Sequence, residues 1–264
     1  METHLNGIRL HYEDVGAGPA LLLLHAFPLS GAMWRDQVDW LRGEYRLIVP
    51  DLRGFGGSDA PPGPATMEQQ ADDMAALLEQ LGVDRAVVVG LSMGGYIAFA
   101  FWRRHADKVA ALCLADTKAG ADSDEGRAGR EANARLAEEQ GANAIAEKMI
   151  PSLVAAGASQ AVRDELRAMI GANSPDGIAA ALRGMALRPD STPDLASISV
   201  PTLLIVGEAD ALTPPAEATK INMGVAGRPT YVAVLPDVGH LSAMEAPEAF
   251  SIALADFLGQ LGGW

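Results

Sequence analysis

The chain has 264 residues, of which 20 are Lys or Arg and 34 are Asp or Glu, so its formal net charge is −14. A chain this acidic does not favour nucleic acids or anionic membranes as partners. Its length is that of one α/β domain with a modest insertion.

The sequence predicts neither a membrane span nor a secretion signal. The apolar run at 21–24 is too short to cross a bilayer, and residues 1–4 lack the basic and apolar regions of a signal peptide. Cys113 is the single cysteine and cannot form an internal disulfide, which is typical of a reducing compartment. We therefore expect a cytoplasmic protein, monomeric or homodimeric, with Cys113 as an inert thiol in a buried strand.

The first part of the chain predicts extended segments. Residues 3–15 alternate polar and apolar side chains around Asn6-Gly7, a dipeptide typical of a tight hairpin turn. A continuous apolar strand follows at 20–24, as expected where helices cover both faces of a sheet. The next strand, at 45–50, leads into a glycine-rich loop at 51–59.

The loop at 51–59 combines glycines with fixed charges. It has neither the Lys-Ser/Thr pair of a P-loop nor a Gly-x-Gly-x-x-Gly pattern opening a helix, so we do not interpret it as a phosphate site. We expect Asp51 and Arg53 to shape this loop through hydrogen bonds. A helix follows it, and Thr66 and Gln69 form its capping box.

The most informative stretch is 87–98, where a β-branched run ends at Gly90 and a helical segment follows Ser92. Strand, sharp turn and helix around Gly-Leu-Ser-Met-Gly are the pattern of a nucleophile elbow, which projects a serine hydroxyl from the sheet edge. Glycines flank Ser92 because so tight a turn leaves room only for small neighbours. The pattern predicts a nucleophile at Ser92 and a helix over 93–104; the alternative is a serine that merely caps this helix.

The chain divides into a core domain at 1–116 and 195–264 and a helical cap at 117–194. In the cap, β-branched runs give way to Ala, Glu, Arg and Met, which predicts a helical insertion. An insertion at this place would cover Ser92 as a lid. Its helices are expected at 124–140, 142–150, 160–173 and 175–187, with breaks at Pro151, Gly157 and Pro189.

Six apolar residues of the cap leave two interpretations open. They could line an apolar acyl pocket, or they could form an ordinary helix-helix core, since Met at helical spacing commonly fills gaps. The six are Met149, Ile150, Leu153, Met169, Ile170 and Met185.

The strand pattern resumes at 200–207 and again at 230–235. Strands that alternate with helices predict an α/β fold, here a mostly parallel eight-stranded sheet with helices on both faces. Ligands bind such sheets at the carboxyl ends of the strands. Ser92, Asp210 and His240 all follow such ends.

A serine hydroxyl needs a base within hydrogen-bond reach, and the base needs a carboxylate that fixes its tautomer. The chain supplies these groups in the order Ser92, Asp210, His240, which is the order of the elbow-bearing fold. Asp116 also follows a strand and is the alternative acid. Asp237 is better interpreted as part of a turn.

A tetrahedral oxyanion needs preorganised donors, and backbone N–H groups suffice. We expect the amide of Met93, directly after the nucleophile, and the amide of Phe27, in the loop after an apolar strand. Pro28 has no N–H and cannot serve. Side chains of Phe27, Met93, Leu212 and Leu241 are predicted to line the substrate pocket, although those of Phe27 and Met93 could equally be core packing.

Five ordered motifs carry a family resemblance, on which the chain is similar to the α/β-hydrolase superfamily. Within it, the chain resembles small carboxylesterases, 3-oxoadipate enol-lactone hydrolases, acyl-homoserine-lactone hydrolases and cofactor-free haloperoxidase- or perhydrolase-like esterases. It departs from the usual pattern at Ala26, where most members carry Gly. Pro28 is a feature in which the chain resembles members that also accept peroxide in place of water. The motifs are His25-Ala26-Phe27-Pro28, Asp51-Leu52-Arg53-Gly54-Phe55-Gly56-Gly57-Ser58, Gly90-Leu91-Ser92-Met93-Gly94-Gly95, Gly207-Glu208-Ala209-Asp210 and Gly239-His240.

The resemblance implies a serine hydrolase that cleaves small-molecule esters or lactones through an acyl-enzyme on Ser92, with no metal and no organic cofactor. Haloalkane dehalogenases and epoxide hydrolases resemble this fold but carry aspartate at the elbow. Carbon–carbon bond hydrolysis and perhydrolase- or haloperoxidase-like acyl transfer are alternatives on the same triad. A catalytically silent ligand receptor is a further alternative, which the joint presence of Ser92, Asp210 and His240 disfavours.

Overall fold

The computed structural model describes residues 1–226 and 229–262. The predicted core segment 195–264 therefore includes residues 227–228 and 263–264, which lie outside the described residues. None of the described helices combines the length and the hydropathy that a bilayer span requires.

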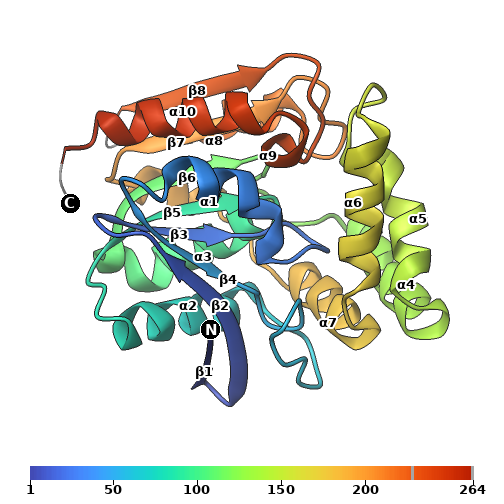
Figure 1. The fold of residues 1–264 in the computed structure, drawn as a ribbon. Helices are drawn as coiled ribbons and strands as arrows, with labels where there is room; N and C mark the ends of the chain where they lie inside the picture. Colours follow the sequence, from blue (N-terminus) through green and yellow to red (C-terminus); the bar gives the residue numbers. More distant parts are fainter. Residues whose placement is uncertain (227–228, 263–264) are drawn as a thin grey trace.

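Eight strands form one sheet in the order β1-β2-β4-β3-β5-β6-β7-β8 (Figure 1). β2 pairs antiparallel with β1 and β4, and the other neighbours pair in parallel. The predicted eight-stranded, mostly parallel sheet is confirmed. The strands are β1 (Glu2–Leu5), β2 (Ile8–Val15), β3 (Ala20–Leu24), β4 (Arg46–Pro50), β5 (Ala86–Leu91), β6 (Val109–Ala115), β7 (Thr202–Gly207) and β8 (Thr230–Leu235).

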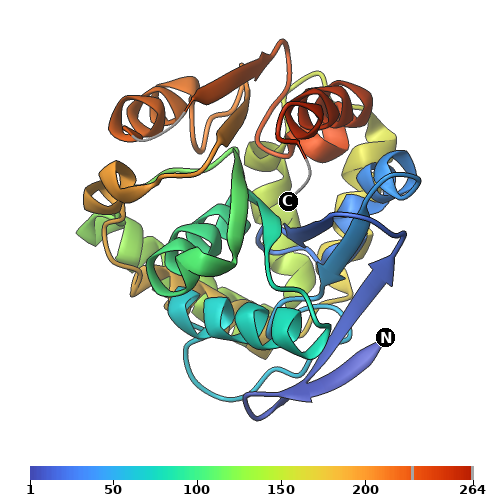
Figure 2. The same ribbon diagram turned by 90° about the vertical axis from the view of Figure 1, so that its left-hand side faces the viewer.

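Helices cover both faces of this sheet. α1 and α10 lie on one face, and α2, α3 and α8 lie on the other (Figures 1 and 2). β3 and β5 are buried along their whole length, as their unbroken apolar runs predict. These helices are α1 (Arg35–Leu41), α2 (Met67–Gln80), α3 (Met93–His105), α8 (Pro215–Gly224) and α10 (Pro247–Gly259), and the short α9 (Ser242–Glu245) precedes α10.

Local sequence signals act where they were expected. The turn between β1 and β2 places Asn6 at φ 46° and Gly7 at φ 80°, the left-handed conformation that a two-residue hairpin requires. The side chain of Thr66 accepts a hydrogen bond from the amide of Gln69 at 3.1 Å and begins α2. The predicted hairpin and helix start are both confirmed.

Four helices lie between β6 and β7, beyond the carboxyl ends of the parallel strands (Figure 1). The sequence predicts that the second of them ends before Pro151, but α5 continues through it to Leu153. Pro151 falls in the last turn, where little helix remains to be disrupted, and the hydroxyl of Ser152 donates to the carbonyl of Met149 at 2.9 Å. The helices are α4 (Asp124–Gln140), α5 (Ala142–Leu153), α6 (Gln160–Gly171) and α7 (Pro175–Ala186).

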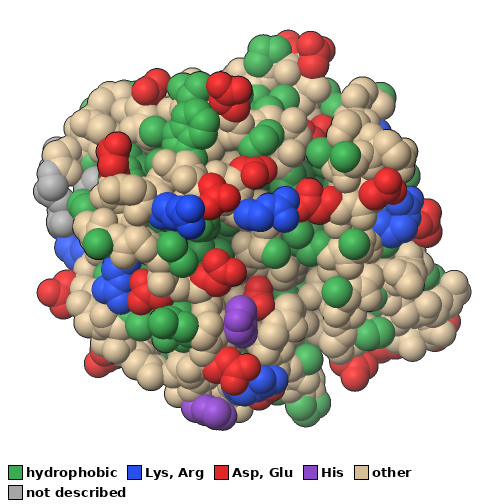
Figure 3. Space-filling model, in the orientation of Figure 1, with side chains coloured by type: hydrophobic (Ala, Val, Ile, Leu, Met, Phe, Trp, Pro, Cys, Tyr) green, Lys and Arg blue, Asp and Glu red, His purple; other side chains and the backbone are tan. Residues whose placement is uncertain are grey.

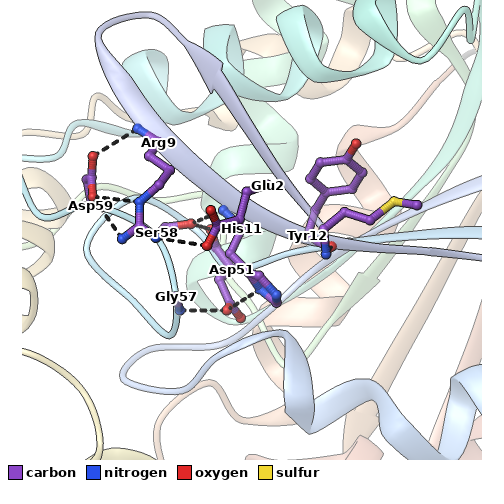
Figure 4. A network of polar contacts seen from close by, with 9 residues as sticks. Glu2, Arg9, His11, Tyr12, Asp51, Gly57, Ser58 and Asp59 are labelled. Carbon is purple, nitrogen blue, oxygen red and sulfur yellow. Dashed lines mark hydrogen bonds and ion pairs between the residues drawn. The ribbon is translucent and has the colours of Figure 1, made fainter.

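The glycine-rich loop after β4 is held by its own carboxylate. The Oδ2 atom of Asp51 accepts from His11 Nδ1 at 2.9 Å and from the amide of Gly57 at 2.8 Å (Figure 4). Its Oδ1 atom accepts from the amide of Gly31 at 2.8 Å, and Ser58 Oγ donates to its carbonyl at 2.6 Å. Asp51 therefore fixes the loop against β2 and against the segment that follows β3, as expected.

Arg53 fixes the same loop against α2. Its Nε and Nη2 atoms donate to the two carboxylate oxygens of Asp73, each at 2.8 Å, and both side chains are buried. Other charged side chains lie at the surface, where acidic and basic ones are interspersed over the face drawn in Figure 3. A buried bidentate ion pair is geometrically specific, whereas most ion pairs at the surface contribute little to stability.

Replacing Arg53 with Met should destabilise the fold by about 3 kcal/mol, because it leaves the Asp73 carboxylate buried without its positive partner, although the Asn6 amide still donates to it. Urea unfolding followed by circular dichroism measures this change. The matched control is Arg42→Met, which removes an exposed arginine 3.5 Å from Asp39 and should change stability by less than about 0.5 kcal/mol. Equal effects of the two substitutions would contradict a role for the buried pair.

Candidate active site

Ser92 lies in the turn from β5 into α3, in a backbone conformation that residues other than glycine rarely adopt. Its φ is 55° and its ψ is −109°. A Cβ atom on Gly90 would lie 2.3 Å from the carbonyl oxygen of Gly94, and one on Gly94 would lie 2.1 Å from that of Leu24. Both positions therefore require glycine, and the turn that exposes the serine depends on this close approach.

His240 and Asp210 reach Ser92 from the loops after β8 and β7. The Nε2 atom of His240 is 2.8 Å from Ser92 Oγ, and its Nδ1 atom is 2.9 Å from Asp210 Oδ2. All three side chains are buried. The structure thus brings together the three residues predicted as nucleophile, base and acid.

The Asp210 carboxylate is held by further donors. Thr213 Oγ1 donates to Oδ2 at 2.6 Å, and the amides of Leu212 and Thr213 donate to Oδ1 at 2.8 and 3.0 Å. Burial opposes the ionised form of Asp210, but the hydrogen bonds from His240 and Thr213 outweigh it and lower the pKa of Asp210 below its ordinary value. Asp210 is therefore ionised where His240 needs a negative partner.

Asp116, the alternative acid, has other partners. Its Oδ1 atom accepts from the amide of Gly207 at 2.9 Å, and its Oδ2 atom accepts from Ser242 Oγ. Burial raises the pKa of Asp116 to about 7, although His240 and these hydrogen bonds oppose the rise. Asp116 thus joins the ends of β6 and β7 to the segment after His240. Asp237 is an exposed turn residue, as expected.

The two predicted oxyanion donors are the amide of Phe27, after β3, and that of Met93, the first residue of α3. Within residues 1–226 and 229–262, neither amide donates to a protein acceptor. His25 fixes the first of these segments, because its Nε2 accepts from the amide of Leu52 and its Nδ1 donates to the carbonyl of Ala26, both at 2.9 Å. Burial lowers the pKa of His25 to about 4, so the ring is neutral at pH 7.

A cavity of about 200 Å³ opens onto Ser92 and His240. Its wall combines apolar side chains from the core, α5 and α7 with a smaller polar set. The lining residues are Phe27, Ser92, Tyr96, Lys118, Arg130, Met149, Leu153, Met185, Leu212, Thr213 and His240.

Two of the four predicted pocket residues, Phe27 and Leu212, line this cavity. Met93 and Leu241 are not among the residues that line it. Both side chains are fully buried in the core. The amide of Leu241 donates to the carbonyl of Leu153 at 3.1 Å, which fixes the backbone beside the cavity.

The six apolar residues of the cap support both interpretations, since Leu153 and Met185 belong to the cavity wall and to the buried core. Met149, Leu153 and Met185 line the cavity. Ile150 and Ile170 belong to the buried core. Met169 is partly buried and packs against that core.

Four lining residues have no counterpart among the sequence predictions, and one of them, Thr213, donates to the Asp210 carboxylate. Tyr96 lies one helical turn after Ser92, and this spacing is a signal that could have identified it. Lys118 lies in the segment after β6, two residues beyond Asp116. Arg130 comes from α4, and only tertiary packing brings it to the cavity.

Neither a metal centre nor a reactive thiol is found among the described residues. They contain no group of three or more His, Cys, Asp or Glu side chains arranged to hold a metal ion. Cys113 is fully buried in β6, and burial raises the pKa of its thiol. The thiol is therefore protonated and inaccessible.

Comparisons with known proteins agree with this fold. A family model described as alpha/beta hydrolase fold matches residues 19–137. A thermophilic esterase from Thermogutta terrifontis, solved with malate bound, is 44% identical with a TM-score of 0.94, over 98% of this chain and 97% of that one. The enol-lactonase from Burkholderia xenovorans LB400 is 31% identical with a TM-score of 0.91, over 98% of this chain and all of that one (100%).

Similarity to epoxide hydrolases is more local. Epoxide hydrolase 2 of Siraitia grosvenorii is 44% identical over 110 residues, which are 40% of this chain and 35% of that protein. The match thus spans about a third of the length of this relative. With the full-length similarity to the two solved structures, these matches show that the chain belongs to the α/β-hydrolase fold family.

The buried proton of Asp116 should make stability depend on pH. The folded protein keeps this proton up to about pH 7, while an exposed aspartate loses it near 3.8, so unfolding releases a proton between these values. The free energy of unfolding then falls as pH rises, by up to about 1.4 kcal/mol per pH unit from this group. Urea titrations between pH 4.5 and 7.5 should show wild type losing stability relative to Asp116→Asn. Parallel pH profiles would contradict the assignment.

Proposed function

We propose that the chain is a serine hydrolase that cleaves carboxylic esters or lactones of small molecules through an acyl-enzyme on Ser92. The observation that carries the proposal is the buried hydrogen-bonded series from Ser92 through His240 to Asp210 at a cavity. The full-length similarity to an esterase and an enol-lactonase supports it.

The geometry provides for each proton transfer. His240 Nε2, 2.8 Å from Ser92 Oγ, takes the hydroxyl proton as the oxygen attacks the carbonyl carbon. Asp210 stabilises the imidazolium that forms, and the amides of Phe27 and Met93 donate to the oxyanion. His240 then protonates the leaving alkoxide. Water attacks the acyl-enzyme by the same steps and releases the acid.

The nucleophile favours esters over epoxides. A carboxylate that opens an epoxide forms an ester, which water can cleave in a second step. A serine hydroxyl would instead form an ether with the opened ring, and the triad has no route to hydrolyse an ether. Ser92 at the elbow therefore supports an acyl substrate, despite the local similarity to epoxide hydrolases.

Residues 117–194 serve in this proposal as a cap over the nucleophile, and residues 1–116 and 195–264 serve as the core domain. The cap helices α5 and α7 contribute Met149, Leu153 and Met185 to the cavity wall. The apolar part of the pocket is thus shared between cap and core, which supports a role of the cap in substrate selection.

Ser92→Ala should lower hydrolysis of p-nitrophenyl acetate and butyrate by about 10³-fold or more, because the nucleophilic oxygen is lost. A panel of p-nitrophenyl esters and γ-lactones with acylamide tails, assayed with and without a chelator, measures this loss. Circular dichroism should show an unchanged fold. Ser199→Ala, at an exposed serine, is the matched control and should retain wild-type rates. Full activity in Ser92→Ala would refute the proposal.

Asp210→Asn and Asp116→Asn should separate the orienting acid from the structural one. Asp210→Asn should lower kcat by about 10⁴-fold, because the amide no longer fixes the required tautomer of His240. Asp116→Asn should cost less than about tenfold, because its partners are Gly207 and Ser242 rather than the reacting groups. Steady-state kinetics with p-nitrophenyl butyrate compares the two variants. A larger loss in Asp116→Asn would reassign the acid.

A further inference from the structure

The cavity that holds Ser92 has cationic side chains in its wall. Lys118, from the segment after β6, and Arg130, from α4, line it together with Ser92 and His240. The chain as a whole carries a formal charge of −14, so positive charge at this site runs against the overall composition. An acyl pocket for a neutral ester needs no such charges.

Three cations in this region share one carboxylate. Asp122 binds Arg130, lies 2.9 Å from Arg188 Nη1 and lies 3.5 Å from Lys118 Nζ. Burial opposes the ionised form of Asp122, but Arg130 and Arg188 outweigh it and lower its pKa to about 2. Asp190 also lies close enough to Arg188 for its carboxylate to attract that guanidinium. Two negative charges therefore face three positive ones, which leaves an excess of one.

The excess charge lies close to the reacting groups. The guanidinium carbon of Arg188 lies 4.0 Å from the ring centroid of Tyr96, which is on α3, the helix that directly follows Ser92. Among the described residues, Asp210 is a second carboxylate at the cavity wall, and it is already bonded to His240 and Thr213. The positive charge is therefore not balanced from that side.

The two lining cations have donors to spare. Arg130 Nη1 contacts the sulfur of Met185 at 3.3 Å, and a thioether is a weak acceptor. Lys118 makes its one ion pair within the described residues at 3.5 Å, although an ammonium has three donors. The side chains of Lys118 and Arg130 are 29% and 19% exposed, so they are accessible but partly withdrawn from water.

Partly desolvated positive charge in excess of its carboxylate partners is unfavourable, and an anion in the cavity would relieve it. A carboxylate fits best, since guanidinium and ammonium groups both bind it through charge-assisted hydrogen bonds. The cavity volume of about 200 Å³ limits the chain that bears it to a few carbons.

We propose that Lys118 and Arg130 bind a carboxylate of the substrate, so that the enzyme acts on short esters or lactones that carry a second, ionised acid group. This proposal rests on the proposed function, because it concerns the same cavity.

Paired substrates test it. Monomethyl succinate, glutarate and adipate are compared with their neutral monoamides, and acetoxyacetate is compared with acetoxyacetamide, which moves the charge to the alcohol side. Acid release is followed by pH-stat titration. Wild type should prefer the carboxylate member of at least one pair by tenfold or more in kcat/KM. Lys118→Met should reduce that ratio about tenfold, and Lys118→Glu should reduce it further.

Lys148→Met is the matched control, because Lys148 lies on α5 and its Nζ atom contacts Asn133. This variant should keep the wild-type ratio. A carboxylate-to-amide ratio of kcat/KM near one in wild type, or a ratio that Lys118→Met leaves unchanged, would overturn the proposal. If neutral esters were still hydrolysed in a reaction that requires Ser92, the proposed function would remain intact.

Binding of the anion can be measured without turnover. Glutarate and glutaramide are titrated calorimetrically into Ser92→Ala protein, with and without Lys118→Met. Binding of glutarate but not glutaramide, lost in the double variant, would support the anion site even if no ester were cleaved. Absence of glutarate binding, or binding that Lys118→Met does not weaken, would overturn it.

Discussion

The close approach of backbone around Ser92 is the constraint on which the rest of the site depends. α3 can begin directly after β5 only because Gly90 and Gly94 leave no side chain between the helix, its own strand and the carbonyl of Leu24. The serine accepts a strained conformation as a result, at φ 55°. The buried strands β3 and β5 supply the rigid packing that holds this strain, so the hydroxyl has a fixed position against which the other groups are placed.

Parallel strands turn distant positions into neighbours. β6 and β7 pair side by side, and their carboxyl ends place Asp116 and Asp210 at one edge of the sheet. The two carboxylates differ in their surroundings: Asp210 accepts from His240, while Asp116 accepts from Gly207 and holds the loop beyond the histidine. Equivalent positions in the topology thus serve different purposes because their hydrogen-bond partners differ.

The sequence predicted what depends on local pattern. Unbroken apolar runs identified the buried strands, and the elbow pattern identified Ser92. It did not predict the 3-10 turn at Gly31–Trp34 or α1 after it, because both are too short for a helical period to emerge. The direction of individual side chains was also beyond it, so Leu241 points into the core rather than the cavity. Arg130 reaches the cavity only through packing of α4, which no local spacing encodes.

The hydrogen bond from the amide of Leu241 to the carbonyl of Leu153 has a mechanical consequence. It joins the residue next to His240 to the last residue of α5, and the carboxylate of Glu245 adds a second link by accepting from the amide of Ala155 at 2.8 Å. The end of α5 and the histidine loop are therefore attached to each other at two points. The position of the imidazole is thus tied to the packing of α5, and a substitution that shifts α5 would strain the segment that holds His240 against Ser92.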